Sequence, residues 1–224
     1  MKPFRNNFTL VLIGAFVVVS CPSLAQTEPS GFYASAYVEA SHLGSTTFDE
    51  IGNAGLGSGL RASFSSGLGL GGEVGYRYGN GWAAEFEWNW RRHNLKSLNG
   101  GGAALATEGD FASNMLFVNG LRRFVGQAGG WVPYAGAGVG WVQEIDFDIN
   151  SAAVERAWSD QGKVGVQLIG GVEIPIDSTW RLVADARFLR LGSVELSAEE
   201  GATGRLSRPD YNPVSVRLGL RRMF

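Results

Sequence analysis

Charged residues alternate with apolar residues along several stretches of this sequence, at a spacing that could bring acids and bases together. Where a stretch forms a strand, residues two apart share a face. The charged residues that would share the face opposite the apolar one are Glu73, Arg77, Glu85, Glu87, Arg91, Lys163, Glu173, Arg181, Asp185, Arg187, Arg217 and Arg221. If that face is enclosed, these groups could pair into a rigid charged plug, because buried charges need partners.

Two histidines are the other candidates for chemistry. His42 and His93 fall near the ends of predicted strands, with Ser41, Ser97 and Asp110 nearby in sequence. A histidine beside a serine or an acid can activate a nucleophile for acyl transfer. The spacing matches no recognisable catalytic motif, so the favoured interpretation is that both histidines are ordinary polar groups at strand ends, and no catalytic residue is predicted.

The sequence predicts no metal site, no cofactor site and no nucleic-acid partner. It has no Cys/His cluster and no Asp-rich loop with ligand spacing. Its glycine pairs are not a dinucleotide motif, because no helix is expected after a strand. The formal net charge of -2 is too small to indicate nucleic-acid binding.

The N-terminus predicts export. Lys2 and Arg5 precede an uncharged stretch from residue 8 to residue 19, and a small-residue cleavage site follows at Ser23-Leu24-Ala25. This is the pattern of a signal peptide over residues 1–25, and the stretch is too short to span a membrane as a helix. Residues 26–224 then form one domain. An alternative is cleavage before Cys21, which would leave a lipidated cysteine as the first residue. This alternative is disfavoured if the chain is a membrane barrel, because a barrel anchors itself and gains little from one acyl chain.

Composition and alternation together predict an all-β fold. The chain has 33 Gly, 7 Trp, 13 Phe and 6 Tyr, and 18% of its residues are charged. No later stretch approaches the roughly twenty apolar residues of a spanning helix. Eight alternating stretches are each near the length with which a tilted strand crosses a bilayer, and they cover about 32–42, 67–78, 82–93, 112–124, 132–143, 163–174, 180–191 and 213–224.

The third stretch shows most clearly what must surround the strands. Its apolar face consists of Trp82, Ala84, Phe86, Trp88 and Trp90, opposite a polar face of Glu85, Glu87, Asn89, Arg91 and His93. Large aromatics on the outside of a soluble sheet would promote aggregation, whereas facing lipid they are expected. We therefore predict a transmembrane antiparallel up-and-down β-barrel, most simply of eight strands, with ten left open.

Turn geometry predicts the register. Tyr78 pairs with Trp82 around residues 79–81, because a two-residue turn would set opposed faces together. Ile174 is placed opposite Trp180, which sets Glu173 opposite Arg181. The remaining links, 43–66, 94–111, 144–162 and 192–212, are long and rich in small polar residues, as extracellular loops of outer-membrane barrels are. Residues 60–65 could instead extend a strand.

Three segments resemble the small outer-membrane β-barrel proteins of the OmpA type. They are Trp131-Val132-Pro133-Tyr134-Ala135-Gly136-Ala137-Gly138-Val139-Gly140-Trp141, Gly170-Gly171-Val172-Glu173-Ile174-Pro175, and the C-terminal strand that ends in Phe224. The resemblance implies an outer-membrane location and insertion by the barrel-assembly machinery, with Phe224 as the assembly signal. Arg122, Arg123 and Arg222 depart from the pattern. Inward glycines 136, 138 and 140 would make room for long side chains in a narrow barrel.

The same resemblance bears on function. The register places Glu73 opposite Glu87, and like charges repel unless a cation lies between them, for which Arg217 and Arg187 are candidates. In OmpA-type barrels a buried glutamate that exchanges basic partners is thought to control a small pore. Some similar barrels are lipid-modifying enzymes.

The leading hypothesis is a structural or surface-exposed outer-membrane protein without catalysis, resembling bacterial surface antigens. A narrow gated pore is the alternative, and a lipid-modifying acyl hydrolase a distant third. Outer-membrane lipid and lipopolysaccharide are the expected surroundings, and the loops could bind a host or cell-surface ligand. Their apolar residues, which more simply pack on one another, are Phe48, Ile51, Leu56, Phe64, Ile149, Val154 and Trp158.

Overall fold

A computed structural model describes residues 29–57, 59–101, 103–106, 108–126, 130–151, 154–192, 194–199, 201–207 and 209–224, with the backbone alone at residues 103, 151, 154 and 155. The predicted signal peptide, Cys21 and the side chain of Val154 lie outside this set. Within the described residues, no helix is long and apolar enough to cross a membrane.

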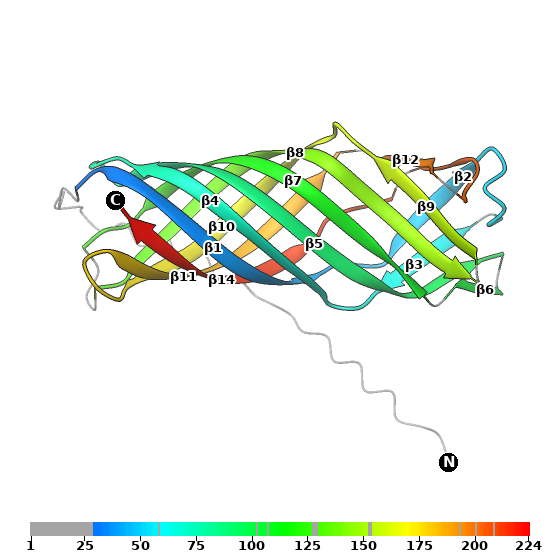
Figure 1. Cartoon of the computed structure of the whole chain (residues 1–224), viewed down its shortest axis with the longest axis horizontal. Helices are drawn as coiled ribbons and strands as arrows, with labels where there is room; N and C mark the ends of the chain where they lie inside the picture. The colour runs from blue at the N-terminus through cyan, green and yellow to red at the C-terminus, as the bar shows by residue number, and fades with distance from the viewer. Residues whose placement is uncertain are drawn as a thin grey trace, which may run out of the picture.

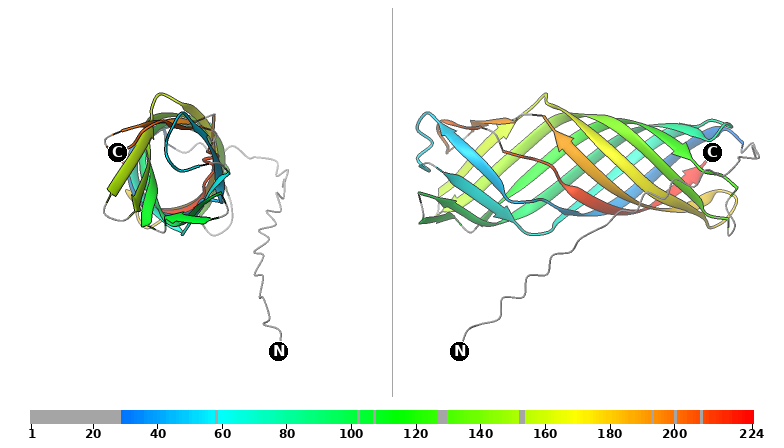
Figure 2. Two further views of the ribbon diagram at one scale, coloured as in Figure 1. Left: turned by 90° about the vertical axis from the view of Figure 1, so that its right-hand side faces the viewer. Right: turned by 180° about the vertical axis from the view of Figure 1, so that it is seen from behind.

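In the described part of the chain, eight strands close into a ring, here called the main barrel (Figures 1 and 2). They are β1 (Gly31–His42), β4 (Gly67–Arg77), β5 (Trp82–Gly100), β7 (Glu108–Arg123), β8 (Val132–Ser151), β10 (Val164–Pro175), β11 (Trp180–Leu191) and β14 (Val214–Met223). Each strand pairs antiparallel with its sequence neighbour in this set, and β14 closes the ring against β1. The predicted fold class and all eight predicted stretches are confirmed.

The long links are not simple loops, contrary to the prediction. They contain β2 (Thr46–Ile51), β3 (Leu60–Phe64), β6 (Ala103–Ala106), β9 (Val154–Asp160), β12 (Glu195–Ala198) and β13 (Arg205–Ser207). With the extended ends of β5, β7 and β8, five of these strands form a second closed ring in the order β5-β3-β2-β13-β12-β9-β8-β7, here called the distal barrel. It lies at the end of the molecule opposite the C-terminus (Figure 1).

Apolar side chains cover the outside of the main barrel. On β5 the outward tryptophans are between 36% and 51% exposed, while the residues between them are buried in the lumen. The same alternation continues on the other strands, for example at Leu218 and Arg217 of β14. A continuous belt of exposed hydrophobic side chains is what a barrel presents to a bilayer.

Inward glycines make room for long side chains, as predicted, although the neighbouring strand supplies those side chains and not a facing one. Gly138 of β8 pairs with Asn119 of β7, and Gly140 pairs with Phe117. A Cβ atom at either glycine would collide with the side chain of its partner. Glycine at these positions therefore lets β7 side chains lie flat across β8.

One predicted turn is confirmed. The backbone N–H of Tyr78 donates to the carbonyl of Trp82 at 2.8 Å, so residues 79–81 form the turn. Gly81 has a φ of 84°, the left-handed conformation that a three-residue hairpin needs near its end.

The other predicted turn is wrong. Ile174 lies opposite Leu182 and not Trp180, and Glu173 lies opposite Val183 and not Arg181, because the first strand runs two residues further toward the turn and Ile176 donates to the Trp180 carbonyl at 2.9 Å. The turn comprises residues 177–179, where the Asp177 carboxylate accepts backbone hydrogen bonds from residues 179 and 180 at 2.7 Å each. A shift of two residues preserves the faces, so Glu173 still points inward.

The interior of the distal barrel is apolar. Its core, here called the apolar plug, contains Leu43, Phe48, Leu56, Leu60, Phe64, Leu95, Leu98, Phe111, Met115, Val142, Ile145, Phe147, Ile149, Trp158, Leu189, Leu196, Leu206 and Tyr211. Phe48 stacks on Phe147 with 4.9 Å between ring centroids, and Phe147 also contacts Trp158. The apolar loop residues therefore mostly pack on one another, with Ile51 left 39% exposed.

Candidate functional site

A network of charged side chains fills the lumen of the main barrel and is here called the lumen network. Its strands alternate polar-in and apolar-out, which brings charges from six of the predicted stretches into one interior. The members are Glu73, Glu85, Glu87, Glu173, Asp185, Arg123, Arg187, Arg217 and Arg221, all of them buried. The predicted pairing of lumen charges is thus a property of the structure.

Two glutamates form the centre of the lumen network. Glu73 and Glu87 are direct cross-strand partners, as the register predicted. Arg217 lies 2.8 Å from the Glu87 carboxylate and 3.4 Å from that of Glu73, and Arg187 lies 2.5 Å and 3.7 Å from the same two groups. Asp185 lies 2.9 Å from Arg217. Both arginines proposed from the sequence therefore hold the two like charges together.

A second cluster lies nearer the chain termini and centres on Arg221. Its guanidinium contacts Glu85 at 2.7 Å, Glu173 at 2.5 Å and also Glu73. Glu173 has a further cation, Arg123, at 2.8 Å. Because Glu73 also contacts Arg187 and Arg217, the two clusters form one continuous network across the barrel.

Tyrosines of β1 also belong to the lumen network, and the sequence analysis missed them. The Tyr37 hydroxyl donates to Glu87 at 2.7 Å and its ring lies 3.7 Å from the Arg217 guanidinium. Tyr33 donates to Glu85 at 2.9 Å in the same way. The alternation within residues 32–42 places both tyrosines on one face of the strand. It could not show which face points inward, because a tyrosine ring suits a lipid face as well as an interior one.

The remaining predicted lumen residues fall into three groups. Arg77 is buried and Arg181 half-buried toward the end that carries the C-terminus. Arg91 is buried above the lumen network and contacts Glu39, which the sequence analysis missed, at 3.3 Å. Lys163 directly precedes β10, is partly exposed and lies 3.4 Å from the Asp160 carboxylate, apart from the lumen network.

Only one of the two histidines faces the interior. The Oγ atom of Ser41 and the Nε2 atom of His93 share a hydrogen bond of 2.8 Å, whereas His42 is exposed on the opposite face of β1. The prediction that His93 lies at a strand end is wrong, since β5 continues to residue 100. Asp110 instead forms an ion pair with Arg92 at 2.6 Å.

The Ser41–His93 pair is enclosed between the lumen network and the apolar plug. His93 is 0% exposed, and its ring lies 6.2 Å from that of Tyr211, a member of the plug. A general base must come within hydrogen-bond reach of the proton it removes from the substrate or nucleophile. A lipid substrate could reach this pair only if the plug opened, so the geometry favours a structural role for the hydrogen bond.

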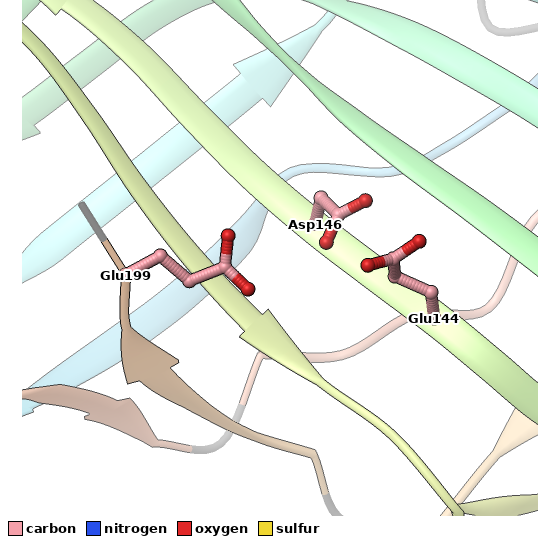
Figure 3. Close-up of side chains that lie close together, drawn as sticks. All are labelled: Glu144, Asp146 and Glu199. Carbon is pink, nitrogen blue, oxygen red and sulfur yellow. The ribbon is translucent and has the colours of Figure 1, made fainter.

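Three carboxylates gather on the outer surface of the distal barrel, a cluster absent from the sequence predictions. Glu144 and Asp146 of β8 and Glu199, which follows β12, place one oxygen each within 4.8 Å of one another (Figure 3). Burial, then repulsion from Glu144 and other acids, raises the pKa of Asp146 to about 7. The first two could be read from their spacing on one strand face, but Glu199 is brought in by tertiary structure.

The family follows from a comparison with known proteins. The sequence matches the outer membrane protein beta-barrel domain over residues 11–224. The chain belongs to this family. No curated protein matches the chain in sequence. The family and the fold identify a β-barrel protein of the Gram-negative outer membrane.

Solved structures share the fold of this family member. The outer membrane protein OprG from Pseudomonas aeruginosa has a TM-score of 0.65 and 16% identity, over 87% of this chain and 96% of its own. Neisserial surface protein A has a TM-score of 0.50 and 17% identity, over 88% of this chain and 100% of its own. The protease OmpT from Escherichia coli, at 8% identity and a TM-score of 0.43, is too remote to bear on catalysis.

Membership in the family orients the barrel. Outer-membrane barrels have short periplasmic turns and long extracellular connections, so the distal barrel lies outside the cell. Arg222 then faces outward at the periplasmic rim, with its guanidinium 5.8 Å from the Trp180 ring and 5.3 Å from the Phe224 ring. An arginine facing lipid costs only about 0–1 kcal/mol near the interface, which explains why the departure from the motif is tolerated.

Proposed function

We propose that this protein is a sealed outer-membrane barrel that presents its distal barrel at the cell surface to bind a host or cell-surface ligand. The observation that carries the proposal is the apolar plug above the charged lumen. The described side chains thus close the interior twice, first with paired charges and then with aromatic and aliphatic groups.

Packing in the apolar plug argues against a simple conduction path. Phe48, Phe111, Phe147 and Trp158 are each at most 1% exposed, and they come from four strands around the distal barrel. Moving an ion past them requires it to shed its hydration among groups that cannot replace it. A surface protein needs no such path, because its recognition chemistry lies on loops held by a rigid scaffold.

The outer rim of the distal barrel is built as such a scaffold. The loop after β2 folds around the carboxylate of Glu50, which accepts backbone hydrogen bonds from residues 54–57 at 2.7 to 3.3 Å. Thr203, in the loop after β12, donates to the carbonyl of Asn53 at 2.6 Å. Loops fixed in this way can bind a ligand without a large ordering cost.

Single-channel recording tests whether the barrel is sealed. The full chain, refolded and inserted into a planar bilayer, should show no steady conductance. Replacing Phe147 and Trp158 together by alanine removes large side chains from the plug but leaves the charged lumen closed, so this variant alone should not conduct. Leak events should rise only when Glu87→Gln is added to it. Steady conductance of the wild-type protein would overturn the proposal.

Surface binding is tested on the tip of the distal barrel. Replacing residues 52–57 by a short Gly-Ser linker should reduce attachment of expressing cells to host cells or to other bacteria, without altering the heat-dependent gel shift of the folded barrel. Replacing residues 177–179, on the periplasmic side, is the matched control. Equal attachment of both variants and the wild type would contradict the recognition role.

A gated pore is the second candidate, and one contact favours it. Glu87 contacts both Arg187 and Arg217, so it could lose one cation and keep the other. A gate of this kind would open when Glu87→Gln weakens both contacts. Conductance that rises in Glu87→Gln with the plug intact would favour the pore over the sealed barrel.

A further inference from the structure

The extracellular mouth of the distal barrel contains a small hollow with an arginine in its wall. The hollow has a volume of about 220 Å³ and is lined by Asn53, Ala54, Gly55, Arg156, Gly201 and Thr203. These residues come from the loop after β2, from β9 and from the loop after β12. A hollow of this volume is large enough for several waters or for one sugar-sized group.

Arg156 points into the barrel and not toward the outer surface. It lies two residues before Trp158 on β9, and Trp158 is a buried member of the apolar plug. Residues two apart on a strand share a face, so the Arg156 side chain lies directly above the plug. The carboxylates of Glu144, Asp146 and Glu199 are on the outer surface and do not line the hollow.

The guanidinium of Arg156 is partly buried and has no partner among the described residues. No described side chain or carbonyl forms a hydrogen bond or ion pair with it. By contrast, Arg92 of the outer surface pairs with Asp110, and Arg205, also in the distal barrel, pairs with Glu195. A partly buried arginine with free donors is suited to take up an anion.

The walls of the hollow are held in place before any ligand binds. The Glu50 carboxylate fixes the loop that carries Ala54 and Gly55. The indole N–H of Trp158 donates to the carbonyl of Thr203 at 3.3 Å, which ties the plug to the opposite wall. Gly55 has a φ of 69°, so a larger residue there would strain the loop as well as narrow the hollow.

We propose that this hollow binds the carboxylate, sulfate or phosphate group of an anionic sugar. Arg156 forms a forked pair of hydrogen bonds to two oxygens of the anion, which is the geometry that guanidinium groups favour. The side-chain amide of Asn53 is available for sugar hydroxyls, and the Thr203 oxygen, whose proton goes to the Asn53 carbonyl, can accept a hydrogen bond from one. The inference rests on the proposed surface function and names the chemistry of its ligand.

Calorimetric titration of the full refolded chain in detergent tests the site. The probes are glucuronic acid, N-acetylneuraminic acid, glucose 6-sulfate and glucose 6-phosphate, with glucose as the neutral control. At least one acidic sugar should bind and glucose should not. The charged probes also distinguish the source, since a phosphate preference indicates lipopolysaccharide and a carboxylate or sulfate preference indicates a host glycan.

Two arginine variants separate the hollow from general surface charge. Arg156→Gln should weaken binding roughly tenfold to hundredfold, the range expected for losing a charged hydrogen-bonded pair. Arg61→Gln removes the same charge from the exposed outside of β3 and should leave affinity unchanged. Arg156→Lys should recover part of the affinity, because it restores the charge without the fork.

Several outcomes would overturn the inference. One is that none of the four acidic probes binds, and another is that Arg156→Gln and Arg61→Gln weaken binding equally. If the wild-type barrel is silent in conductance and adheres through its tip but binds no acidic sugar, this site fails while the proposed function stands. Steady conductance with retained sugar binding would mean that the sealed-barrel function fails while the sugar site stands.

Discussion

Adjacent arginines on the last strand provide a direct test of the lumen network. Arg221 is 1% exposed and contacts three carboxylates, whereas its neighbour Arg222 faces outward at the rim. In Arg221→Met, Glu85 loses the cation at 2.7 Å and is left without a counter-ion in a closed interior. Removing one partner of a buried ion pair typically costs about 3–5 kcal/mol.

The control has the same side-chain change one residue away. Arg222→Met should cost about 0–1 kcal/mol, the range for exposed ion pairs and for charges near the membrane interface. A second variant isolates the carboxylate: combining Arg221→Met with Glu85→Gln removes the stranded charge and should recover a large part of the loss. Measured together with the Glu85→Gln single variant, the double variant completes a cycle that gives the coupling between the two residues.

Urea titration of the refolded protein in detergent micelles, followed by tryptophan fluorescence, measures the effect. The free energies follow from midpoints and slopes, and the slopes should remain unchanged if the barrel stays closed. Equal destabilisation by Arg221→Met and Arg222→Met would show that the lumen charges are solvated. A Glu85→Gln substitution that fails to compensate would show that another group bears the cost.

Three further predictions concern the distal barrel, assembly and the two faces of β5. The pKa of Asp146 is raised to about 7 from 3.8 by burial and neighbouring acids, so the folded state binds more protons than the unfolded state between those values. Stability should therefore fall as pH rises through this window, and Asp146→Asn should flatten the unfolding midpoint against pH. Deleting Phe224 should reduce the heat-modifiable fraction in cells, and full insertion of the shortened chain would contradict its role in assembly. Phe86→Cys places a thiol against lipid and Glu87→Cys places one in the filled lumen, so neither variant should react with a membrane-impermeant thiol reagent. Arg61→Cys places a thiol on the exposed outside of β3 and should react.

Alternation predicted the main barrel because it is a local signal. Each strand carries its own apolar and polar faces, so Glu87 and Arg217 could be assigned to the lumen without knowing which strands are neighbours. Register across a short turn is also local, which is why the Glu73–Glu87 pair was predicted correctly. The register of β10 and β11 was missed because it depends on the side chain of Asp177 bonding the turn backbone.

The distal barrel could not be predicted in the same way. Its strands are short, and several of their partners are remote in sequence: β13 pairs with β2, and β12 pairs with β9. Such pairings are decided by tertiary packing and not by local propensity. The sequence contained one hint of this barrel, because Phe48, Phe147 and Trp158 are apolar residues in segments expected to be exposed loops. They are apolar because they pack into one shared core. The Arg156 hollow depends on three such segments and has no signature in the sequence.

The lumen network and the apolar plug resist opening in different ways. This difference favours the surface function over the gated pore. A network of charges such as Glu87, Arg187 and Arg217 is held by strong but exchangeable contacts, so by itself it is compatible with a gate. The apolar plug has no exchangeable partners, and opening it would expose Phe147 and Trp158 to water at a cost of roughly 1.5–3 kcal/mol for each large side chain. Since lumen and plug lie in series along one axis, a path for ions would have to pass both, and this supports the proposed surface function over a gated pore.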